Sequence, residues 1–102
     1  MSLKDQIIQQ INSNNIILFM KGTKEMPMCG FSSTVVKILT HYNVDFKTIN
    51  ILEDTNIRIE LSKYSDWPTI PQLFVEGEFI GGCDIALEMH NSGALGKIIN
   101  KT

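Results

Sequence analysis

Cys29 stands between an apolar strand-like run and an amphipathic helix-like run, in the segment Pro27-Met28-Cys29-Gly30-Phe31-Ser32. A thiol at the start of a helix meets unpaired backbone N–H groups and the positive end of the helix dipole, and both favour the thiolate. A dithiol redox motif would carry a second cysteine three residues later, but Ser32 occupies that position. The sequence therefore predicts a reactive thiolate at Cys29 that cannot close a disulfide within its own motif.

The chain has one other cysteine, Cys83, far from Cys29 in the sequence. A reducing compartment keeps such thiols free unless they are catalytic or bind metal. Two interpretations of Cys83 stay open: its thiol is a spectator, or it resolves Cys29 by forming a disulfide with it. His41 and His90 have no ligand-like spacing to each other or to the cysteines, so a zinc site has little support and both are expected at the surface.

The composition sets the class of protein. With 102 residues, 43% of them hydrophobic and 20% charged, the chain suits one compact domain over residues 1–102. The net charge of -2 comes without a long run of either sign, so binding to nucleic acid or to a membrane surface has no electrostatic basis. The N-terminal segment lacks the apolar core of a secretory signal and the Arg- and Ser-rich composition of a transit peptide. We expect a cytoplasmic protein.

Hydrophobic spacing in the first half predicts alternating helices and strands. Residues 16–20 form a short, continuously apolar run, as expected of a strand buried on both faces. The other expected elements of this half are a helix capped by Ser2, a helix from Phe31 to Tyr42, a strand over Asp45–Asn50, and a helix starting at Asp54 or Thr55.

The second half reads as a hairpin followed by two helices. Residues 72–75 and 78–80 are predicted strands joined through Glu76-Gly77, Asp84 can cap the next helix, and Gly93 separates it from a last short helix. The complete order, αβαβαββαα, predicts an α/β domain with the thioredoxin-like layout. This layout is a four-stranded mixed sheet with helices on both faces.

Four motifs then carry a family resemblance that covers residues 18–85. They are Phe19-Met20-Lys21-Gly22, Cys29-Gly30-Phe31-Ser32, Trp67-Pro68-Thr69-Ile70-Pro71-Gln72 and Gly81-Gly82-Cys83-Asp84. In this order and at these intervals they resemble the monothiol glutaredoxins of the Cys-Gly-Phe-Ser type, as does the extended loop over residues 23–27. The resemblance implies a glutathione-binding protein with the glutaredoxin fold. It also implies a homodimer that carries a 2Fe-2S cluster and passes it to recipient iron-sulfur apoproteins. The implied role lies in cluster assembly and iron homeostasis, and the implied heteromeric partner is a BolA-like protein.

A ligand count supports the implied use of glutathione. An iron-sulfur cluster of this kind takes four ligands, usually thiolates, and two copies of Cys29 supply two of them. Glutathione thiolates would fill the other two positions. The alternative function is a glutathione-dependent thiol-disulfide oxidoreductase that removes glutathione from mixed disulfides, for which one thiolate at Cys29 is sufficient. The extended loop before Cys29 favours the cluster carrier, because relatives with this loop tend to reduce such disulfides poorly.

Two cations are candidates for binding the carboxylates of glutathione. Lys21 follows the first strand, so its ammonium can lie beside Cys29 and the glycine carboxylate. Arg58 is the only arginine in the chain, and its planar guanidinium suits a carboxylate. Arg58 also lies four residues after Asp54, the spacing of an ordinary surface ion pair on a helix. The residues alone leave these two interpretations of Arg58 balanced, and the resemblance favours glutathione.

Three further residues complete the expected groove. The resemblance implies a cis bond between Ile70 and Pro71, which would turn the backbone of Ile70 toward an extended glutathione. The backbone amides of Cys83 and Asp84 open a helix and can hold the γ-glutamyl carboxylate. We expect the Asp84 carboxylate both to cap that helix and to accept from the α-amine of glutathione. Phe31 and Trp67 are expected to border the site or to serve packing alone.

Overall fold

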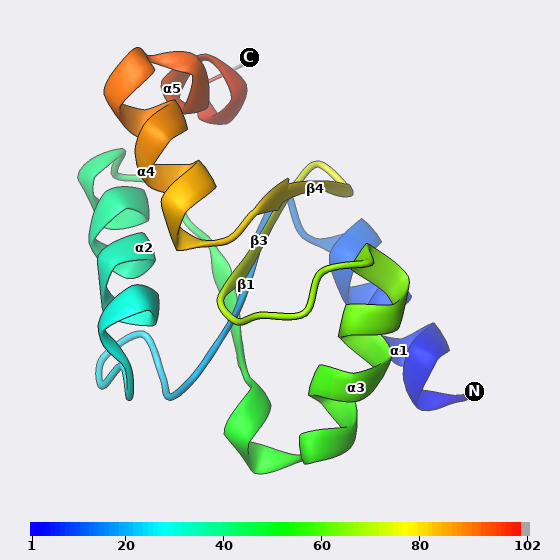
Figure 1. Ribbon diagram of the computed structural model, residues 1–102. Helices are drawn as coiled ribbons and strands as arrows, with labels where there is room; N and C mark the ends of the chain where they lie inside the picture. The colour runs from blue at the N-terminus through cyan, green and yellow to red at the C-terminus, as the bar shows by residue number, and fades with distance from the viewer. Residues whose placement is uncertain (101–102) are drawn as a thin grey trace.

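A four-stranded sheet lies between two layers of helices in the computed structural model, which describes residues 1–100 (Figure 1). The last two residues of the expected domain lie outside the described part. The elements are α1 (Leu3–Ser13), β1 (Ile16–Met20), α2 (Gly30–His41), β2 (Lys47–Asn50), the 3-10 helix η1 (Ile51–Glu53), α3 (Thr55–Ser65), β3 (Gln72–Val75), β4 (Glu78–Gly81), α4 (Cys83–Ser92) and α5 (Ala94–Ile99). Within residues 1–100, no helix is long and apolar enough to cross a membrane.

The sheet has the strand order β2-β1-β3-β4. Strand β1 runs parallel to β2 and antiparallel to β3, and β3 and β4 form the predicted hairpin. All five residues of β1 are buried. This confirms the prediction of a central strand covered on both faces, because only such a strand can be apolar at every position.

Successive side chains of β1 enter two separate cores. Ile16, Leu18 and Met20 belong to a core formed with α2, α4 and α5, whereas Ile17 and Phe19 belong to a core formed with α1 and α3. Figure 1 shows the same division, with α1 and α3 on one side of the sheet and α2, α4 and α5 on the other. The alternation follows from the two-residue repeat of side chains along a strand.

The predicted side-chain caps are correct for α1 and α3 and wrong for α4, although α4 does begin at Cys83, as expected from the prediction that the Cys83 and Asp84 amides open it. The Ser2 hydroxyl caps α1, and the Asp54 carboxylate caps α3 by accepting from the backbone N–H of Asn56 at 2.9 Å. Helix α4 has Gly82 as its N-cap residue, without a side-chain hydrogen bond, so Asp84 lies in the first turn instead. Gly82 is in extended conformation, and the chain therefore enters the helix before reaching Asp84. The Asp84 carboxylate still interacts favourably with the positive end of the helix dipole.

The second strand is shorter than predicted, starting at Lys47 rather than Asp45. Its pairing with β1 begins at Ile17 opposite Lys47, so the residues before Lys47 lack a ladder partner in β1. The Phe46 ring instead packs partly buried against the core on the α2 side, and the Lys24 ammonium lies 4.0 Å from the centre of its ring. This cation–π contact ties the loop before Cys29 to the body of the domain.

Candidate functional site

Cys29 is the N-cap residue of α2, in extended conformation at the point where the loop enters the helix. Its Sγ accepts a hydrogen bond from the backbone N–H of Ser32 at 3.3 Å. A sulfur atom thus occupies the capping position usually held by a serine or aspartate oxygen. The predicted location of the thiol at a helix start is confirmed.

Ser32, predicted from the sequence only to stand where a second cysteine would be, contacts the Cys29 thiol directly. Its side chain is fully buried, and its Oγ lies 3.2 Å from Cys29 Sγ. The same Oγ accepts from the backbone N–H of Lys21 at 3.2 Å. Because the Ser32 oxygen accepts from the Lys21 N–H through one lone pair, its own hydroxyl proton remains free to be donated to the Cys29 thiolate. The signal for this role was the position of Ser32, three residues after the capping cysteine, where N-cap partners occur.

The surroundings of Cys29 favour its ionised form. Partial burial of the thiol acts to raise its pKa, but several opposing effects outweigh burial and hold the pKa of Cys29 below its ordinary value. They are the hydrogen bond from the Ser32 hydroxyl, the hydrogen bonds from the backbone amides of Ser32 and Phe31, and the positive charge of Lys21. Cys29 is therefore suited to act as a nucleophile or as a metal ligand.

A cleft of about 380 Å³ is lined by all five residues predicted from the sequence for the groove. Those residues are Lys21, Arg58, Ile70, Cys83 and Asp84, and they come from the end of β1, from α3, from the loop before β3 and from the start of α4. The lining also includes Phe31, Trp67, Thr69, Pro71, Gly82 and Ile85. Cys29 is not among the lining residues, but Lys21 and Phe31, which both act on its sulfur, are. Residues far apart in the sequence thus converge on one concave surface with two cations on it.

Arg58 does not pair with Asp54, its alternative partner in the sequence analysis. Its Nη2 donates to the backbone carbonyl of Pro68 at 3.3 Å, and the Asp54 carboxylate is used in capping α3. Within residues 1–100, the salt bridge present is the one between Lys63 and Glu60. The exposed guanidinium of Arg58 therefore retains donors that can bind a carboxylate in the cleft.

The loop that leads into β3 lines the cleft with Thr69, Ile70 and Pro71. The peptide bond between Ile70 and Pro71 is cis, as the family resemblance implies. The buried side chain of Gln72 holds this loop, because its Nε2 donates to the carbonyls of Trp67 at 3.0 Å and Thr69 at 3.2 Å. Gln72 is a second residue whose role the sequence analysis missed.

Gly82 allows the start of α4 to approach this loop closely. A Cβ at Gly82 would lie 3.3 Å from the carbonyl oxygen of Pro71 and 3.4 Å from Nε1 of Trp67. These contacts are tighter than most Cβ atoms make, so a larger residue would displace α4 from the loop. The glycine thereby brings the amides of Cys83 and Asp84 to the edge of the cleft.

Cys83 is free, as is Cys29, and the two thiols differ in their ionisation. Burial raises the pKa of Cys83, the negative charges of Asp84 and of Cys29 raise it further, and a hydrogen bond with the Thr34 side chain opposes them only in part. Cys83 therefore remains protonated under conditions in which Cys29 ionises. As the pH rises, Cys29 is therefore the first of the two thiols to become a thiolate.

The comparisons with known proteins agree with these observations. The glutaredoxin family model matches residues 16–80. The chain is 52% identical over 99 residues to "Monothiol glutaredoxin-S14, chloroplastic" of Arabidopsis thaliana, which covers 97% of this chain. The chain belongs to the monothiol glutaredoxins. This glutaredoxin spans 57% of the length of that Arabidopsis protein.

Solved structures confirm the fold of this glutaredoxin. The solution structure of reduced apo GrxS14 from poplar superposes with a TM-score of 0.87 at 49% identity, covering 98% of this chain and 92% of the poplar chain. A crystal structure of a buckwheat glutaredoxin in complex with glutathione has a TM-score of 0.82 at 26% identity and covers 97% and 92% of the two chains. The predicted thioredoxin-like fold and the predicted family are therefore both correct.

Proposed function

We propose that this glutaredoxin binds glutathione and carries a 2Fe-2S cluster as a homodimer, for transfer to recipient iron-sulfur apoproteins. The observation that carries the proposal is the single stabilised thiolate of Cys29 beside a cleft lined by two cations. Each chain offers one half-buried thiol, Cys29, whose pKa is lowered, so a single chain supplies only one thiolate ligand of this kind. A 2Fe-2S cluster needs four ligands, so it would bind between two such chains, each of which supplies one cysteine thiolate.

The groove accounts for how glutathione would be held. In this proposal Lys21 and Arg58 bind its carboxylates by charge-assisted hydrogen bonds, and the Ile70 backbone pairs with its peptide groups. The amides at the start of α4, from Cys83 and Asp84, receive the γ-glutamyl carboxylate, and the Asp84 side chain accepts from the α-amine. Bound in this way, glutathione supplies the second kind of thiolate ligand for the cluster. The glutathione complex of the buckwheat relative supports this assignment.

The partners and the compartment follow from the same proposal. The receiving proteins are iron-sulfur apoproteins, and a BolA-like protein is the expected heteromeric partner. The free state of both cysteines suits the cytoplasm or an equivalent reducing compartment. A role in iron homeostasis would follow from the same cluster-bearing dimer.

Anaerobic purification in the presence of glutathione tests the proposal. We expect a brown dimer with two iron and two sulfide ions and two glutathione molecules per dimer. Cys29→Ser should fold but retain neither iron nor sulfide, whereas Ser33→Ala, on the same helix turn, should match the parent protein. Full cluster occupancy in Cys29→Ser would remove Cys29 from the site. A stable cluster in glutathione-free protein would instead assign the missing ligands to Cys83.

The lowered pKa of Cys29 also supports a second candidate function, the removal of glutathione from mixed disulfides. The Cys29 thiolate would attack the glutathione sulfur, form a disulfide with it and release the target thiolate. A second glutathione thiolate would then attack the bound glutathione sulfur, releasing oxidised glutathione and the Cys29 thiolate. Turnover of a glutathionylated peptide by the apo protein measures this activity. Rapid turnover in a protein that assembles no cluster would favour this second candidate.

A further inference from the structure

His41 and His90, the only histidines of the chain, lie side by side although they are far apart in the sequence. Their ring centroids are 5.3 Å apart, and the Tyr42 ring contacts both, at 5.3 Å from His41 and 5.4 Å from His90. His41 is exposed and His90 is half-buried. The sequence predicted two unrelated surface histidines. The structure corrects this, because the packing of α2 against α4 brings them together.

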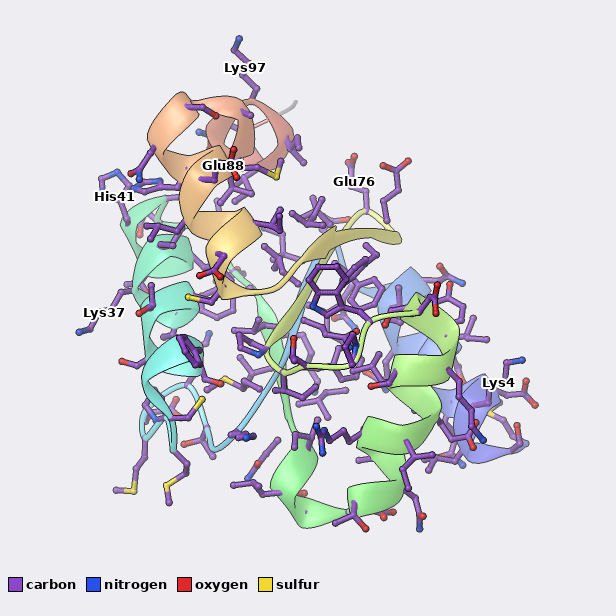
Figure 2. All side chains as sticks on the ribbon, in the orientation of Figure 1. Lys4, Lys37, His41, Glu76, Glu88 and Lys97 are labelled. Carbon is purple, nitrogen blue, oxygen red and sulfur yellow. The ribbon has the colours of Figure 1, made fainter. Side chains whose placement is uncertain are left out.

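The cluster lies at the opposite ends of the two helices that hold the thiols. Helix α2 begins beside Cys29 and α4 begins at Cys83, whereas His41 and His90 occupy the last turns of the same helices. Figure 2 shows His41 at the end of α2 farthest from the loop that enters this helix. The histidines therefore form a site separate from the glutathione cleft, and nothing in the proposed function uses them.

The electrostatics of this position favour a cation. The C-terminal end of a helix carries partial negative charge on its unpaired carbonyl groups, equivalent to about half an elementary charge. Two helix C-terminal turns, those of α2 and α4, meet at the histidine pair. Lys37, one turn earlier on α2, is exposed and extends away from the helix pair in Figure 2.

The spacing of the rings fits coordination to one metal ion. With metal–nitrogen bonds of about 2.1 Å at a tetrahedral angle, two imidazole rings have centroids about 5 Å apart. The observed 5.3 Å agrees with this value. An edge-to-face ring stack without metal has a similar spacing, so the test has to separate the two.

The hydrogen bonding of His90 leaves one ring nitrogen for a metal. Its Nδ1 lies 2.6 Å from the Tyr42 hydroxyl, and either atom can donate, according to the tautomer. When Nδ1–H donates to Tyr42 Oη, the lone pair of Nε2 is available for coordination, and the tyrosine orients the ring as outer partners of metal ligands do. Within residues 1–100, neither ring nitrogen of His41 has a hydrogen bond that would compete with a metal.

We propose that His41 and His90 form a binding site for a divalent cation that prefers imidazole ligands, such as Zn²⁺ or Ni²⁺. Within residues 1–100 no group of three or more His, Cys, Asp or Glu side chains is arranged to hold a metal, so water completes the coordination shell. The absence of a carboxylate cluster at this site disfavours Ca²⁺ and Mg²⁺. Binding there joins the C-terminal ends of α2 and α4 and makes the helix pair more resistant to thermal unfolding.

Titration with Ni²⁺ tests the proposal. Because thiolates also bind this metal, calorimetry is done on the Cys29→Ser/Cys83→Ser protein, and paramagnetic broadening of NMR signals is followed in both this protein and the wild type. We expect the imidazole signals of both histidines to broaden together. His41→Ala and His90→Ala should each weaken binding more than tenfold, and Tyr42→Phe, which removes only the orienting hydroxyl, by about tenfold.

Lys37→Ala is the matched control, being an exposed residue one turn from His41. It should leave the Ni²⁺ affinity unchanged. An unaltered affinity in His41→Ala, or broadening that spares the imidazole signals, would show that the three rings form a packing cluster only. If His90→Ala proves poorly folded, the exposed His41 and the Tyr42→Phe variant still decide the outcome.

Discussion

The Ser32 hydroxyl lies 3.2 Å from the Cys29 sulfur and 3.2 Å from the backbone nitrogen of Lys21, so it links the end of the central strand to the reactive thiol. Lys21 acts on the same sulfur a second time through its charge. Ser32, which stands where a dithiol motif has its second cysteine, therefore also stabilises the Cys29 thiolate. Its replacement of a second cysteine removes the internal disulfide and adds a buried hydrogen-bond donor.

Ser32→Ala should raise the pKa of Cys29. The substitution removes the hydroxyl that donates to the thiolate and leaves the burial of the thiol, which acts in the opposite direction, in place. It also leaves the Lys21 N–H without its acceptor, at a cost of about 1 to 3 kcal/mol in the free energy of unfolding. Titration of the thiolate by ultraviolet absorbance and chemical denaturation measure the two effects.

Ser33→Ala is the control for this substitution, since the side chain of this neighbouring serine on α2 takes no part in the hydrogen bonds of the Cys29 sulfur. The backbone N–H of Ser33, which donates to the Cys29 carbonyl at 3.0 Å, is retained in the variant. The control substitution should change neither quantity. A Ser32→Ala protein that titrates like the wild type would mean that the backbone amides and Lys21 alone determine the ionisation of Cys29.

The two cysteines should react in a fixed order as the pH rises. The pKa of Cys29 is lowered and that of Cys83 is raised, so Cys29 becomes a thiolate first. With a limiting amount of iodoacetamide, modification should be confined to Cys29 at pH values below the ordinary thiol pKa of about 8.5. Peptide mass spectrometry after brief exposure locates the label. Equal labelling of both sites in the folded protein would contradict the assigned difference.

The same difference predicts how ionisation contributes to stability. The folded pKa of Cys29 lies below its unfolded value, so its contribution is present above the unfolded pKa and is lost as the pH falls through the folded pKa. For Cys83 the folded pKa is the higher one, so its contribution is lost as the pH rises through that value. Denaturation of Cys29→Ser and Cys83→Ser between pH 6 and pH 10 should therefore show opposite changes in slope.

The sequence was sufficient for the fold because its signals were local. The apolar run of β1 predicted a fully buried strand, and the turn residues Glu76 and Gly77 placed the hairpin correctly. The cap of α4 was predicted wrongly, because a side-chain capping rule favoured Asp84, whereas Gly82 is the N-cap residue and makes no side-chain hydrogen bond. Gly82 also lies where an added Cβ would come within 3.3 Å of the Pro71 carbonyl oxygen, a tertiary contact that a capping rule does not include.

Residue types and family motifs predicted which residues line the site, but not how these residues are arranged in space. The convergence of Lys21, Arg58 and Asp84 on one cleft agrees with the expected groove, but its geometry depends on tertiary packing. The roles of Ser32 and Gln72 were missed because a buried polar side chain shows its partner only in three dimensions. The histidine pair was missed because its two members lie on different helices, far apart in the sequence, and meet only through the packing of α2 against α4.

Gly22→Ala should destabilise the protein and disturb the loop before Cys29. Gly22 has φ of +91°, and an added Cβ would lie 2.5 Å from the Met26 carbonyl oxygen and 2.6 Å from the Met28 nitrogen. Both are backbone atoms, so the loop itself must move. We expect a loss of about 1 to 3 kcal/mol in unfolding free energy and a change in the alkylation rate of Cys29.

Gly30→Ala is the matched comparison for that loop variant. Gly30 is the first residue of α2, and an added Cβ meets no atom within 4 Å. This substitution should leave stability unchanged or raise it by about 0.4 to 1 kcal/mol, because alanine restricts the unfolded chain. Thermal unfolding of the two variants side by side checks the pair, and equal Tm values would contradict the assigned strain at Gly22.

Arg58→Ala should weaken glutathione binding without destabilising the fold. The guanidinium is exposed at the cleft and makes one hydrogen bond, to the Pro68 carbonyl, rather than an ion pair with Asp54. Loss of a charge-assisted contact of about 1.5 to 3 kcal/mol reduces affinity roughly tenfold or more. The unfolding free energy should change by only a few tenths of a kcal/mol. Calorimetric titration of glutathione into the apo variant, beside a thermal melt, measures both.

Two variants of the same helix give the controls for Arg58. Lys63→Ala removes another cation of α3, one paired with Glu60 at 3.7 Å, and should leave glutathione affinity unchanged. Asp54→Ala removes the N-cap of α3 and should cost about 1 kcal/mol of stability with little effect on glutathione. Lys21→Ala should reproduce the loss of affinity seen for Arg58→Ala. If Arg58→Ala binds glutathione like the wild type while Lys21→Ala does not, the carboxylate contacts belong to Lys21 and the α4 amides alone.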